Sequence, residues 1–228
     1  MKAILIPVKE FAQAKKRLAP HFSGADRAAL AKALCADFFQ VIDRVRGVDR
    51  IFVVSKETEA LALARAAGWE NIVESDQHSE SASVDFASRQ CAGQGITSLL
   101  RIPVDLPLVE PRDIEILFDS LDDSPSTVLA PSSDGTGTNA LLRTPPTLFP
   151  SHFGPNSFAL HLAEANALGI QPRIVRNPGL EFDIDELADL QKIAPMVPAG
   201  SNIARWFSER PQIGGFRNRP ARASSLAD

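Results

Sequence analysis

Cysteine is scarce in this sequence of 228 residues, and membrane-length apolar runs and an excess of positive charge are missing from it. The two cysteines, Cys35 and Cys91, are too few and too far apart for a disulfide framework or a zinc ribbon, which favours a reducing, cytoplasmic compartment. No run approaches the roughly 20 apolar residues of a membrane-spanning helix. The formal net charge of −4 argues against nucleic acid or an anionic membrane as the main partner.

We expect one domain followed by a short tail. The length suits a single large α/β domain, which we place at residues 1–209. Its first residues, 1–9, contain a short apolar run that ends at a second lysine, which predicts a strand rather than a signal peptide. Residues 210–228 hold four arginines and almost no apolar side chains, so we expect a solvated, disordered tail there.

Short apolar segments alternate with amphipathic helical segments along the chain. Strands are predicted at residues 3–8, 50–55, 71–74, 98–102, 127–130 and 173–176, with an extended segment at 181–185. Helices are predicted at 25–45, 57–67, 81–92, 111–121, 158–168 and 186–193. Because strands and helices alternate through the first 130 residues, we expect βαβ units and a mostly parallel sheet with helices on both faces.

Four residues mark where predicted helices begin or end. Ser23 can cap a helix that begins near residue 25, and Pro111 suits the first turn of another. Gly68 and Gly169 suit the position just after a last helical turn.

Polar side chains follow the predicted strands at the end where ligands bind. Open parallel α/β sheets bind ligands outside the carboxyl ends of their strands. One candidate follows each of the first five strands, namely Lys9, Ser55, Asp76, Asp105 and the glycine-rich loop 132–138. We therefore expect all five groups at one edge of the sheet.

Three aspartates form a candidate metal site. Asp105 stands alone in an apolar stretch after a core strand. Asp183 and Asp185 are two apart, so an extended backbone directs both carboxylates to one side while Phe182 and Ile184 face the core. Three carboxylates, completed by water and phosphate oxygens, suit Mg²⁺. Purely structural roles are the alternatives. Asp185 can cap the helix that follows, and Asp105 can accept hydrogen bonds from loop amides.

Two groups of residues can bind anions. The cations Lys9, Lys15, Lys16 and Arg17 lie in one loop at the binding edge, where they can hold a triphosphate or form an ordinary solvated cluster. The loop 132–138 is rich in glycine and hydroxyls, which lets backbone amides approach an anion. Donors from Gly154 and Ser157 precede a helix and can serve a phosphate at its N-terminus, or can merely form a turn and a cap.

Six short motifs occur in an order that resembles one known family. They are Ile6-Pro-Val-Lys9, Ala14-Lys-Lys-Arg-Leu18, Pro103-Val-Asp-Leu-Pro107, Asp134-Gly-Thr-Gly-Thr-Asn139, Phe153-Gly-Pro-Asn-Ser157 and Phe182-Asp-Ile-Asp185. Together they resemble the 2-phospho-L-lactate and phosphoenolpyruvate guanylyltransferases, which make the activated intermediate of the deazaflavin coenzyme F(420). The resemblance covers about residues 3–193.

The resemblance implies a Rossmann-like nucleotidyltransferase fold, similar to that of the molybdenum-cofactor guanylyltransferases, and a role for each group of residues. The implied Mg²⁺ ligands are Asp105, Asp183 and Asp185. The residues implied to bind the phosphorylated three-carbon acid are Thr138, Gly154 and Ser157. Those expected to contact the GTP are Lys9, Lys15, Arg17, Ser55 and Asp85. Of these, we expect Lys9, Lys15 and Asp105 to take part in catalysis.

Two motifs depart from the family pattern. Ser83-Val-Asp85 stands where the family often has Gly-Leu-Asn, in a stretch expected near the base, which leaves the preference for guanine open. The cationic loop has two lysines, so either Lys15 or Lys16 can meet the triphosphate.

We predict a cytoplasmic enzyme that transfers GMP from GTP to 2-phospho-L-lactate, phosphoenolpyruvate or 3-phosphoglycerate and releases pyrophosphate. A homodimer and a downstream transferase that takes the product are further expectations. The alternatives are a nucleotidyltransferase for another phosphorylated acceptor, such as molybdopterin, and a nucleotide-binding module without catalysis. The missing glycine-rich first loop counts against the first alternative, and the three aspartates count against the second.

Overall fold

A single mixed β-sheet forms the centre of the protein. The computed structural model describes residues 1–210 and 213. In the spatial order β3-β2-β1-β4-β6-β5-β7, the strands are β3 (Glu70–Val73), β2 (Arg50–Ser55), β1 (Lys2–Val8), β4 (Ser98–Arg101), β6 (Thr138–Thr144), β5 (Ser126–Pro131) and β7 (Arg173–Ile174). β6 pairs antiparallel with β4 and β5, whereas the other strands share one direction. The predicted mostly parallel α/β sheet is confirmed.

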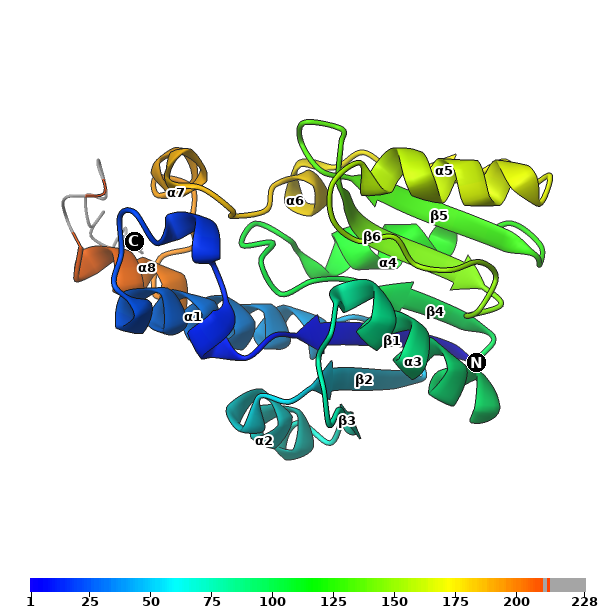
Figure 1. Ribbon diagram of the computed structural model, residues 1–228, viewed down its shortest axis with the longest axis horizontal. Coiled ribbons are helices and arrows are strands. Elements are labelled where there is room, and N and C mark those ends of the chain that lie inside the picture. Colours follow the sequence, from blue (N-terminus) through cyan, green and yellow to red (C-terminus); the bar gives the residue numbers. More distant parts are fainter. Residues whose placement is uncertain (211–212, 214–228) are drawn as a thin grey trace, which may run out of the picture.

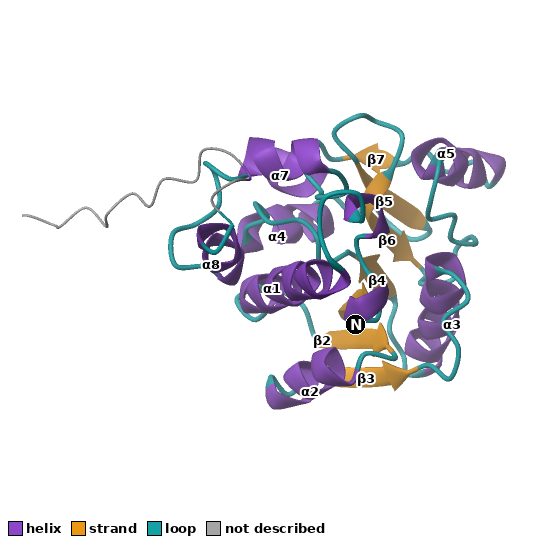
Figure 2. Cartoon of the chain, turned by 60° about the vertical axis from the view of Figure 1, so that its left-hand side comes forward, coloured by secondary structure: helices purple, strands orange, loops and turns teal. Residues whose placement is uncertain are grey.

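Helices cover both faces of this sheet (Figure 1). They are α1 (Gly24–Ile42), α2 (Thr58–Ala66), α3 (Glu80–Gly93), α4 (Pro111–Asp119), α5 (Ser157–Ala167), α6 (Pro178–Glu181), α7 (Leu187–Ile193) and α8 (Asn202–Ser208), with short 3₁₀ turns η1 (Phe11–Gln13) and η2 (Lys16–Leu18). Figure 2 shows α1, α2 and α4 on one side of the strands and α3 and α5 on the other. None of the described helices has the length and apolar character needed to cross a bilayer.

The helix ends follow the local signals in the sequence. The Ser23 hydroxyl accepts a hydrogen bond from the backbone N–H of Asp26 at 3.1 Å, which caps α1. Pro111 is the first residue of α4. Gly68 and Gly169 have φ of 77° and 72°, the left-handed conformation that glycine adopts without strain after a last helical turn.

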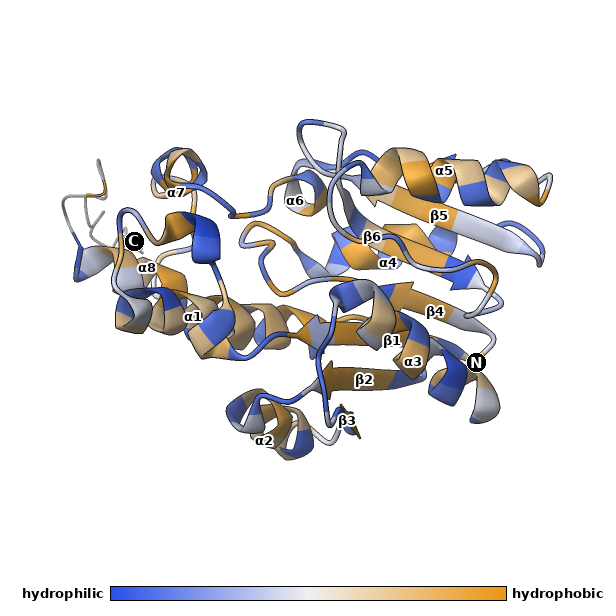
Figure 3. Ribbon diagram, in the orientation of Figure 1, coloured by the Kyte–Doolittle hydropathy of each residue, from blue (hydrophilic) through white to orange (hydrophobic). Residues whose placement is uncertain are grey.

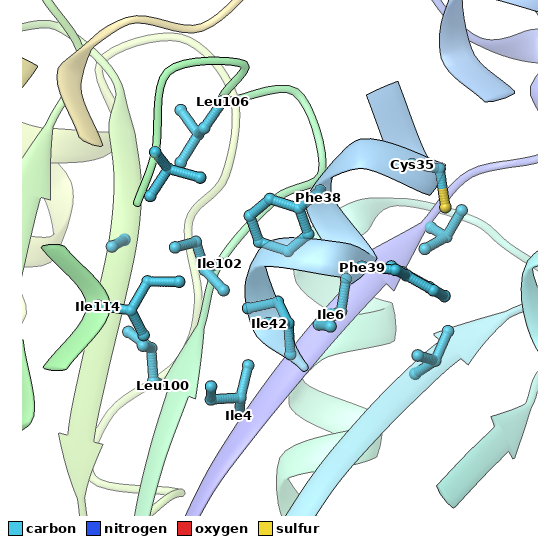
Figure 4. Close-up of a cluster of buried hydrophobic side chains, with 14 of the residues drawn as sticks. Ile4, Ile6, Cys35, Phe38, Phe39, Ile42, Leu100, Ile102, Leu106 and Ile114 are labelled. Atoms are coloured by element: carbon cyan, nitrogen blue, oxygen red, sulfur yellow. The ribbon is translucent and has the colours of Figure 1, made fainter. Parts of the chain in front are cut away.

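The main hydrophobic core lies between the sheet and the face that carries α1 and α4. Figure 4 shows Ile4 and Ile6 from β1 beside Phe38 of α1, with Ile102 and Ile114 adjoining them. The middle residues of β1 and β2 are apolar and buried, because helices cover both faces of these strands (Figure 3). This packing holds the carboxyl ends of β1 and β4 side by side.

A second cluster of buried side chains lies beside the main core. It joins α1 to α8 and includes Phe182 and Ile184, as the alternation at 182–185 predicted. Two residues beyond the predicted domain boundary at residue 209 pack against the domain. Arg210 bonds to Asp26, and Ile213 is buried in this cluster. The rest of the predicted tail lies outside the described residues.

Three elements differ from the sequence prediction. β6 was not among the predicted strands, and it begins at Thr138, the last residue of the predicted glycine-rich loop. α8 was not predicted, although Ser201 caps it by accepting a bond from the N–H of Ala204. α6 takes up residues Pro178–Glu181, so the extended segment begins at Phe182 rather than at Glu181.

Candidate active site

Two cavities, each of about 480 Å³, open beside the carboxyl ends of β1 and β4. We call the one lined by the cationic loop the lysine-side cavity, and the one lined by loop 132–138 the glycine-side cavity. The residues that line both are Arg17, Glu80, Pro103, Asp105 and Asp185. The two cavities therefore meet at a wall that carries two of the predicted metal-binding carboxylates.

Lys15 lies at the centre of this wall. Its Nζ lies 2.6 Å from Asp105 Oδ2 and 3.8 Å from Asp185 Oδ1, and it donates a hydrogen bond to the carbonyl of Ile184. Burial by itself lowers the pKa of Lys15, but the charges of Asp105 and Asp185 outweigh burial and raise the pKa above its ordinary value. The ammonium is therefore a fixed positive charge that links residues 90 positions apart.

The backbone explains why Lys15, rather than its neighbours, takes this position. Lys15 has a φ of 53° at the start of η2, a left-handed turn that directs its side chain inward. Lys9 and Lys16 are exposed, although both line the lysine-side cavity. Arg17 reaches the same wall from the surface, where its Nη1 lies 2.9 Å from Asp185 Oδ2.

The segment that carries the two distal aspartates is fastened to the loop after β4. The Ile184 N–H donates to the carbonyl of Asp105 at 3.2 Å. Asp183 Oδ1 accepts a hydrogen bond from Asn139 Nδ2 at 3.2 Å. Burial, together with the charge of Asp105, raises the pKa of Asp183 to about 6. Burial also raises the pKa of Asp185, although Lys15 acts against it.

Asp185 does not cap the helix that follows it. Glu186 is the N-cap of α7 and forms a reciprocal capping box with Asp189. The Asp185 carboxylate is therefore available to Lys15 and Arg17, and the capping alternative raised by the sequence is wrong.

The oxygen atoms at this wall are of the kind that magnesium prefers. Among the described residues, no three histidine, cysteine, aspartate or glutamate side chains stand close enough together to form a ready-made metal cluster. Asp105, Asp185 and the Ile184 carbonyl instead surround the Lys15 ammonium with oxygens. Carboxylate and carbonyl oxygens are hard ligands, so the chemistry of the donor set fits Mg²⁺.

The glycine-rich loop closes the far side of the glycine-side cavity. Gly135 has a φ of 75°, and the Gly137 N–H donates to the Ser132 hydroxyl at 2.7 Å. A β-carbon at Gly137 would lie 2.9 Å from that hydroxyl oxygen, so a larger residue there would have to displace the Ser132 side chain. The Phe158 N–H donates to the carbonyl of Thr136 at 3.1 Å, which joins the loop to α5.

The three residues predicted to bind the acid substrate come together in this cavity. The Ser157 hydroxyl oxygen accepts a bond from the Thr138 N–H at 2.8 Å, so its own hydrogen is left to donate elsewhere. Gly154 precedes α5 with a φ of 126°. The N-terminus of α5 therefore faces the cavity wall with the helix end that favours anions.

Two predicted nucleotide ligands do not line either cavity. Ser55 is fully buried, donates to the carbonyl of Val8 at 2.6 Å and accepts from the N–H of Glu57 at 2.8 Å. Asp85 points away from the lysine-side cavity and accepts bonds from the N–H of Ser151 at 3.1 and 3.2 Å. Its near neighbour Ser83 lines the cavity instead, because residues two apart on a helix face different directions.

Several residues of the site were not singled out by the sequence. Arg101 and Glu80 line the glycine-side cavity and form an ion pair. Asn139 bonds to the carbonyls of Leu180 and Glu181 as well as to Asp183, which holds the aspartate segment against β6. Arg101 could have been found from the sequence, because a charged residue at the end of an apolar strand requires buried partners and so indicates a polar site.

Comparison with known proteins assigns the chain to a family. The family model described as guanylyl transferase CofC like matches residues 1–204. The chain belongs to this guanylyltransferase family. The resemblance seen in the six motifs is thereby confirmed, and so is the predicted class of enzyme, a nucleotidyltransferase.

Two relatives within this guanylyltransferase family illustrate the similarity. The phosphoenolpyruvate guanylyltransferase of Rubrobacter xylanophilus is 33% identical over 189 residues, which span 83% of this chain and 91% of the relative. The 2-phospho-L-lactate guanylyltransferase of Methanothermobacter thermautotrophicus is 30% identical over 189 residues, or 83% of this chain and 82% of the relative.

The fold extends to more distant structures. A protein assigned as a nucleotide-diphospho-sugar transferase, from Desulfovibrio desulfuricans G20, superposes with a TM-score of 0.74 at 13% identity. The match covers 93% of this chain and 97% of that one. At this identity the likeness concerns the fold, and it confirms the predicted single-domain Rossmann-like arrangement.

Proposed function

We propose that this enzyme transfers GMP from GTP to a phosphorylated three-carbon acid and releases pyrophosphate, as a step of coenzyme F(420) biosynthesis. The candidate acids are 2-phospho-L-lactate, phosphoenolpyruvate and 3-phosphoglycerate. The observation that carries the proposal is the pair of cavities meeting at Asp105 and Asp185. Two substrates bound on opposite sides of that wall would bring their phosphates together.

The lysine-side cavity is the proposed GTP site. Lys9, Lys15, Lys16 and Arg17 all line it, and together they offer positive charge to a triphosphate. Lys15 is held in place by Asp105 and Arg17 pairs with Asp185, whereas Lys9 and Lys16 are exposed and can follow the nucleotide. Such cations also stabilise the charge that develops on departing pyrophosphate.

The glycine-side cavity is the proposed acceptor site. The Ser157 hydroxyl, Thr138 and the start of α5 at Gly154 supply donors for an anion. A phosphate oxygen of the acceptor attacks the α-phosphorus of GTP in line, and the bond from that phosphorus to pyrophosphate breaks. The attacking oxygen is already anionic, so catalysis consists mainly of positioning and charge neutralisation.

Asp105, Asp183 and Asp185 are the residues that would hold Mg²⁺. The ion, when bound, supplies positive charge to the phosphate oxygens of both substrates. The described carboxylates and the Ile184 carbonyl provide the hard oxygen ligands that this role requires.

The cellular setting is part of the proposal. Cys35 and Cys91 are both buried free thiols, which supports the reducing cytoplasm as the compartment. The product carries a reactive phosphoanhydride bond, which supports its direct use by a downstream transferase. A homodimer stays a prediction, to be checked by light scattering.

Release of pyrophosphate tests the reaction directly. We expect release from GTP and Mg²⁺ with at least one of the three acids, and mass spectrometry of the product should find GMP joined to that acid. Absence of pyrophosphate with all three acids would contradict the substrate assignment, and product formation with a pterin phosphate instead would favour the molybdopterin alternative.

Replacement of Asp105 by asparagine tests the carboxylate. We expect Asp105→Asn to lower kcat/KM by about 100-fold or more, because the variant cannot neutralise a cation at the shared wall. Asp76→Asn is the matched control, since Asp76 is exposed after β3 and lines neither cavity. Near-normal turnover by Asp105→Asn would mean that the carboxylate is structural.

A further inference from the structure

Arg101 is a buried cation in the wall of the glycine-side cavity. It is the last residue of β4 and is 5% exposed. Its Nη1 donates to the carbonyls of Thr138 at 3.2 Å and Asn139 at 3.1 Å, and its guanidinium lies 3.9 Å from the ring centroid of Phe153. A buried charge requires partners, and the Nε–H of this guanidinium is a buried donor left without one among the described residues.

The other charged residues of the glycine-side cavity indicate what Arg101 can bind. Its acidic lining residues are Glu80, Asp105, Asp134, Asp183, Asp185, Glu186 and Asp189. Among the described lining residues the cations are Arg17 and Arg101. Arg17 is 65% exposed on its side chain and already pairs with Asp185. Arg101 is therefore the fixed positive charge that an anionic ligand meets inside the cavity.

Glu80 now holds the outer side of the Arg101 guanidinium. Glu80 is the first residue of α3, is 41% exposed on its side chain and lines both cavities. Its carboxylate is paired with Arg101 Nη2. Because that carboxylate is near solvent whereas the arginine is rigidly held, the carboxylate is the partner that can move. A carboxylate on a ligand offers the same planar, two-oxygen surface to the guanidinium.

We propose that Arg101 binds the carboxylate of the acceptor substrate, and that Glu80 is an internal carboxylate that yields this position when the acceptor binds. The pair then selects phosphate esters that also carry a carboxylate over phosphate esters that do not. This inference rests on the proposed acceptor site and adds the residue that recognises the acid group. It also gives Glu80 a role at both cavities, since its displacement moves a negative charge from the acceptor toward the nucleotide side.

A matched pair of acceptors tests the proposal. The acid that the wild-type enzyme uses is compared with its analogue in which the carboxylate is replaced by a hydroxymethyl group, such as 3-phosphoglycerate with glycerol 3-phosphate. We expect the wild-type enzyme to favour the acid by about 10–100-fold in kcat/KM, the range of a charge-assisted hydrogen bond. Arg101→Gln should reduce this preference to near unity, mainly by raising the KM of the acid and leaving the KM of GTP unchanged.

Glu80→Gln is expected to act in the opposite direction. The amide competes weakly for Arg101, so the KM of the acid should fall while the KM of the hydroxymethyl analogue stays the same. Arg143→Gln is the matched control: Arg143 is also a buried arginine, on β6, but it bonds to Ser88 and the Phe149 carbonyl and lines neither cavity. The control variant should keep the wild-type preference for the acid.

The outcomes separate this inference from the proposed function. If the wild-type enzyme releases no pyrophosphate with any acid, both fail. If it is active and Arg101→Gln slows the acid and its analogue by the same factor, the inference fails and the proposed function stands. If Arg101→Gln does not fold, as judged by circular dichroism, the same preference for the acid is measured in Arg101→Lys, and the KM of the acid is measured in Glu80→Gln. A wild-type preference in Arg101→Lys, with an unchanged KM for the acid in Glu80→Gln, overturns the proposal.

Discussion

His161 shows how burial fixes the charge and the proton position of one side chain. It is fully buried in α5, and its Nε2 accepts a bond from the His152 N–H at 2.9 Å. The neutral ring therefore carries its proton on Nδ1, which lies 2.9 Å from the Thr138 hydroxyl and donates to it. The Thr138 hydroxyl hydrogen is then left to point elsewhere, as a donor beside the acceptor cavity.

The same histidine makes the free energy of unfolding depend on pH. Burial, with the charge of Arg143, lowers the pKa of His161 to about 3. Its pKa in the unfolded chain is about 6.5, so its contribution to stability is complete above that pH and is lost as the pH falls toward 3. We expect the free energy of unfolding to drop by about 2 kcal/mol from this residue between pH 7 and pH 5.

Urea unfolding of the wild type and His161→Gln at both pH values measures this dependence. The variant should lose most of the drop, whereas the exposed His21→Gln should behave as the wild type. An unchanged pH dependence in His161→Gln would show that other groups are responsible.

The two neighbouring lysines are expected to differ in importance. Lys15→Met removes the cation that lies between Asp105 and Asp185, so we expect kcat to fall by about 100-fold. Lys16→Met removes an exposed charge and should change kcat less than about tenfold. Steady-state kinetics at saturating GTP compares the two. A larger effect at Lys16 would reverse the assignment.

The sequence predicted that aspartates and lysines would lie at the candidate site, but not which lysine would form an ion pair with which aspartate. Asp105, Asp183 and Asp185 were expected at one place, and all three line the glycine-side cavity. Their role as metal ligands stays a prediction. The partnership of Lys15 with Asp105 depends on a left-handed turn and on contacts 90 residues apart, which no local pattern encodes. For the same reason Ser55, next to a strand end, was expected in the site, although its hydroxyl is used within the fold.

At the scale of elements, the start of α5 is built around one backbone conformation. Gly154 has a φ of 126°, which a residue with a β-carbon adopts only with strain. We expect Gly154→Ala to raise the KM of the acceptor acid several-fold by moving the N-terminus of the helix. Gly169→Ala is the control at the other end of α5, where φ is 72°. It should cost about 1 kcal/mol in thermal unfolding without changing that KM; equal kinetic effects would argue against a role for the helix start.

Helices were easier to predict than the direction of strands. Ser23, Gly68, Pro111 and Gly169 mark helix ends by local hydrogen bonding and φ, so their signals are visible in the sequence. β6 is buried along its whole length, and its short apolar segment, residues 140–142, carries no sign of the direction in which the strand runs. Its antiparallel pairing with β4 and β5 is decided by the short connection from β5, a tertiary constraint.

At the scale of the whole molecule, the end of the described chain supports the site. α8 packs on α1, and Phe207 lies fully buried in the cluster that also contains Phe182 and Ile184. We expect Phe207→Ala to lower the free energy of unfolding by about 3–5 kcal/mol. It should also raise the Mg²⁺ concentration needed for half-maximal activity, because the segment between Phe182 and Asp185 loses its support.

A second core substitution checks that this effect is local. Phe52→Ala removes a fully buried ring from the cluster around β2, whose members do not include the residues 182–185 of the aspartate segment. It should cost a similar amount of stability in chemical denaturation and leave the Mg²⁺ dependence unchanged. A shift of equal size in both variants would attribute the effect to general loosening.

The wall shared by the two cavities also sets the kinetic order of the reaction. Asp105 and Asp185 face both cavities at once, so neither substrate has to leave before the other arrives. A direct transfer between two bound substrates passes through a ternary complex and not through a guanylylated enzyme. Double-reciprocal plots should therefore intersect rather than run parallel, and GTP carrying a chiral sulfur at its α-phosphorus should give a product of inverted configuration.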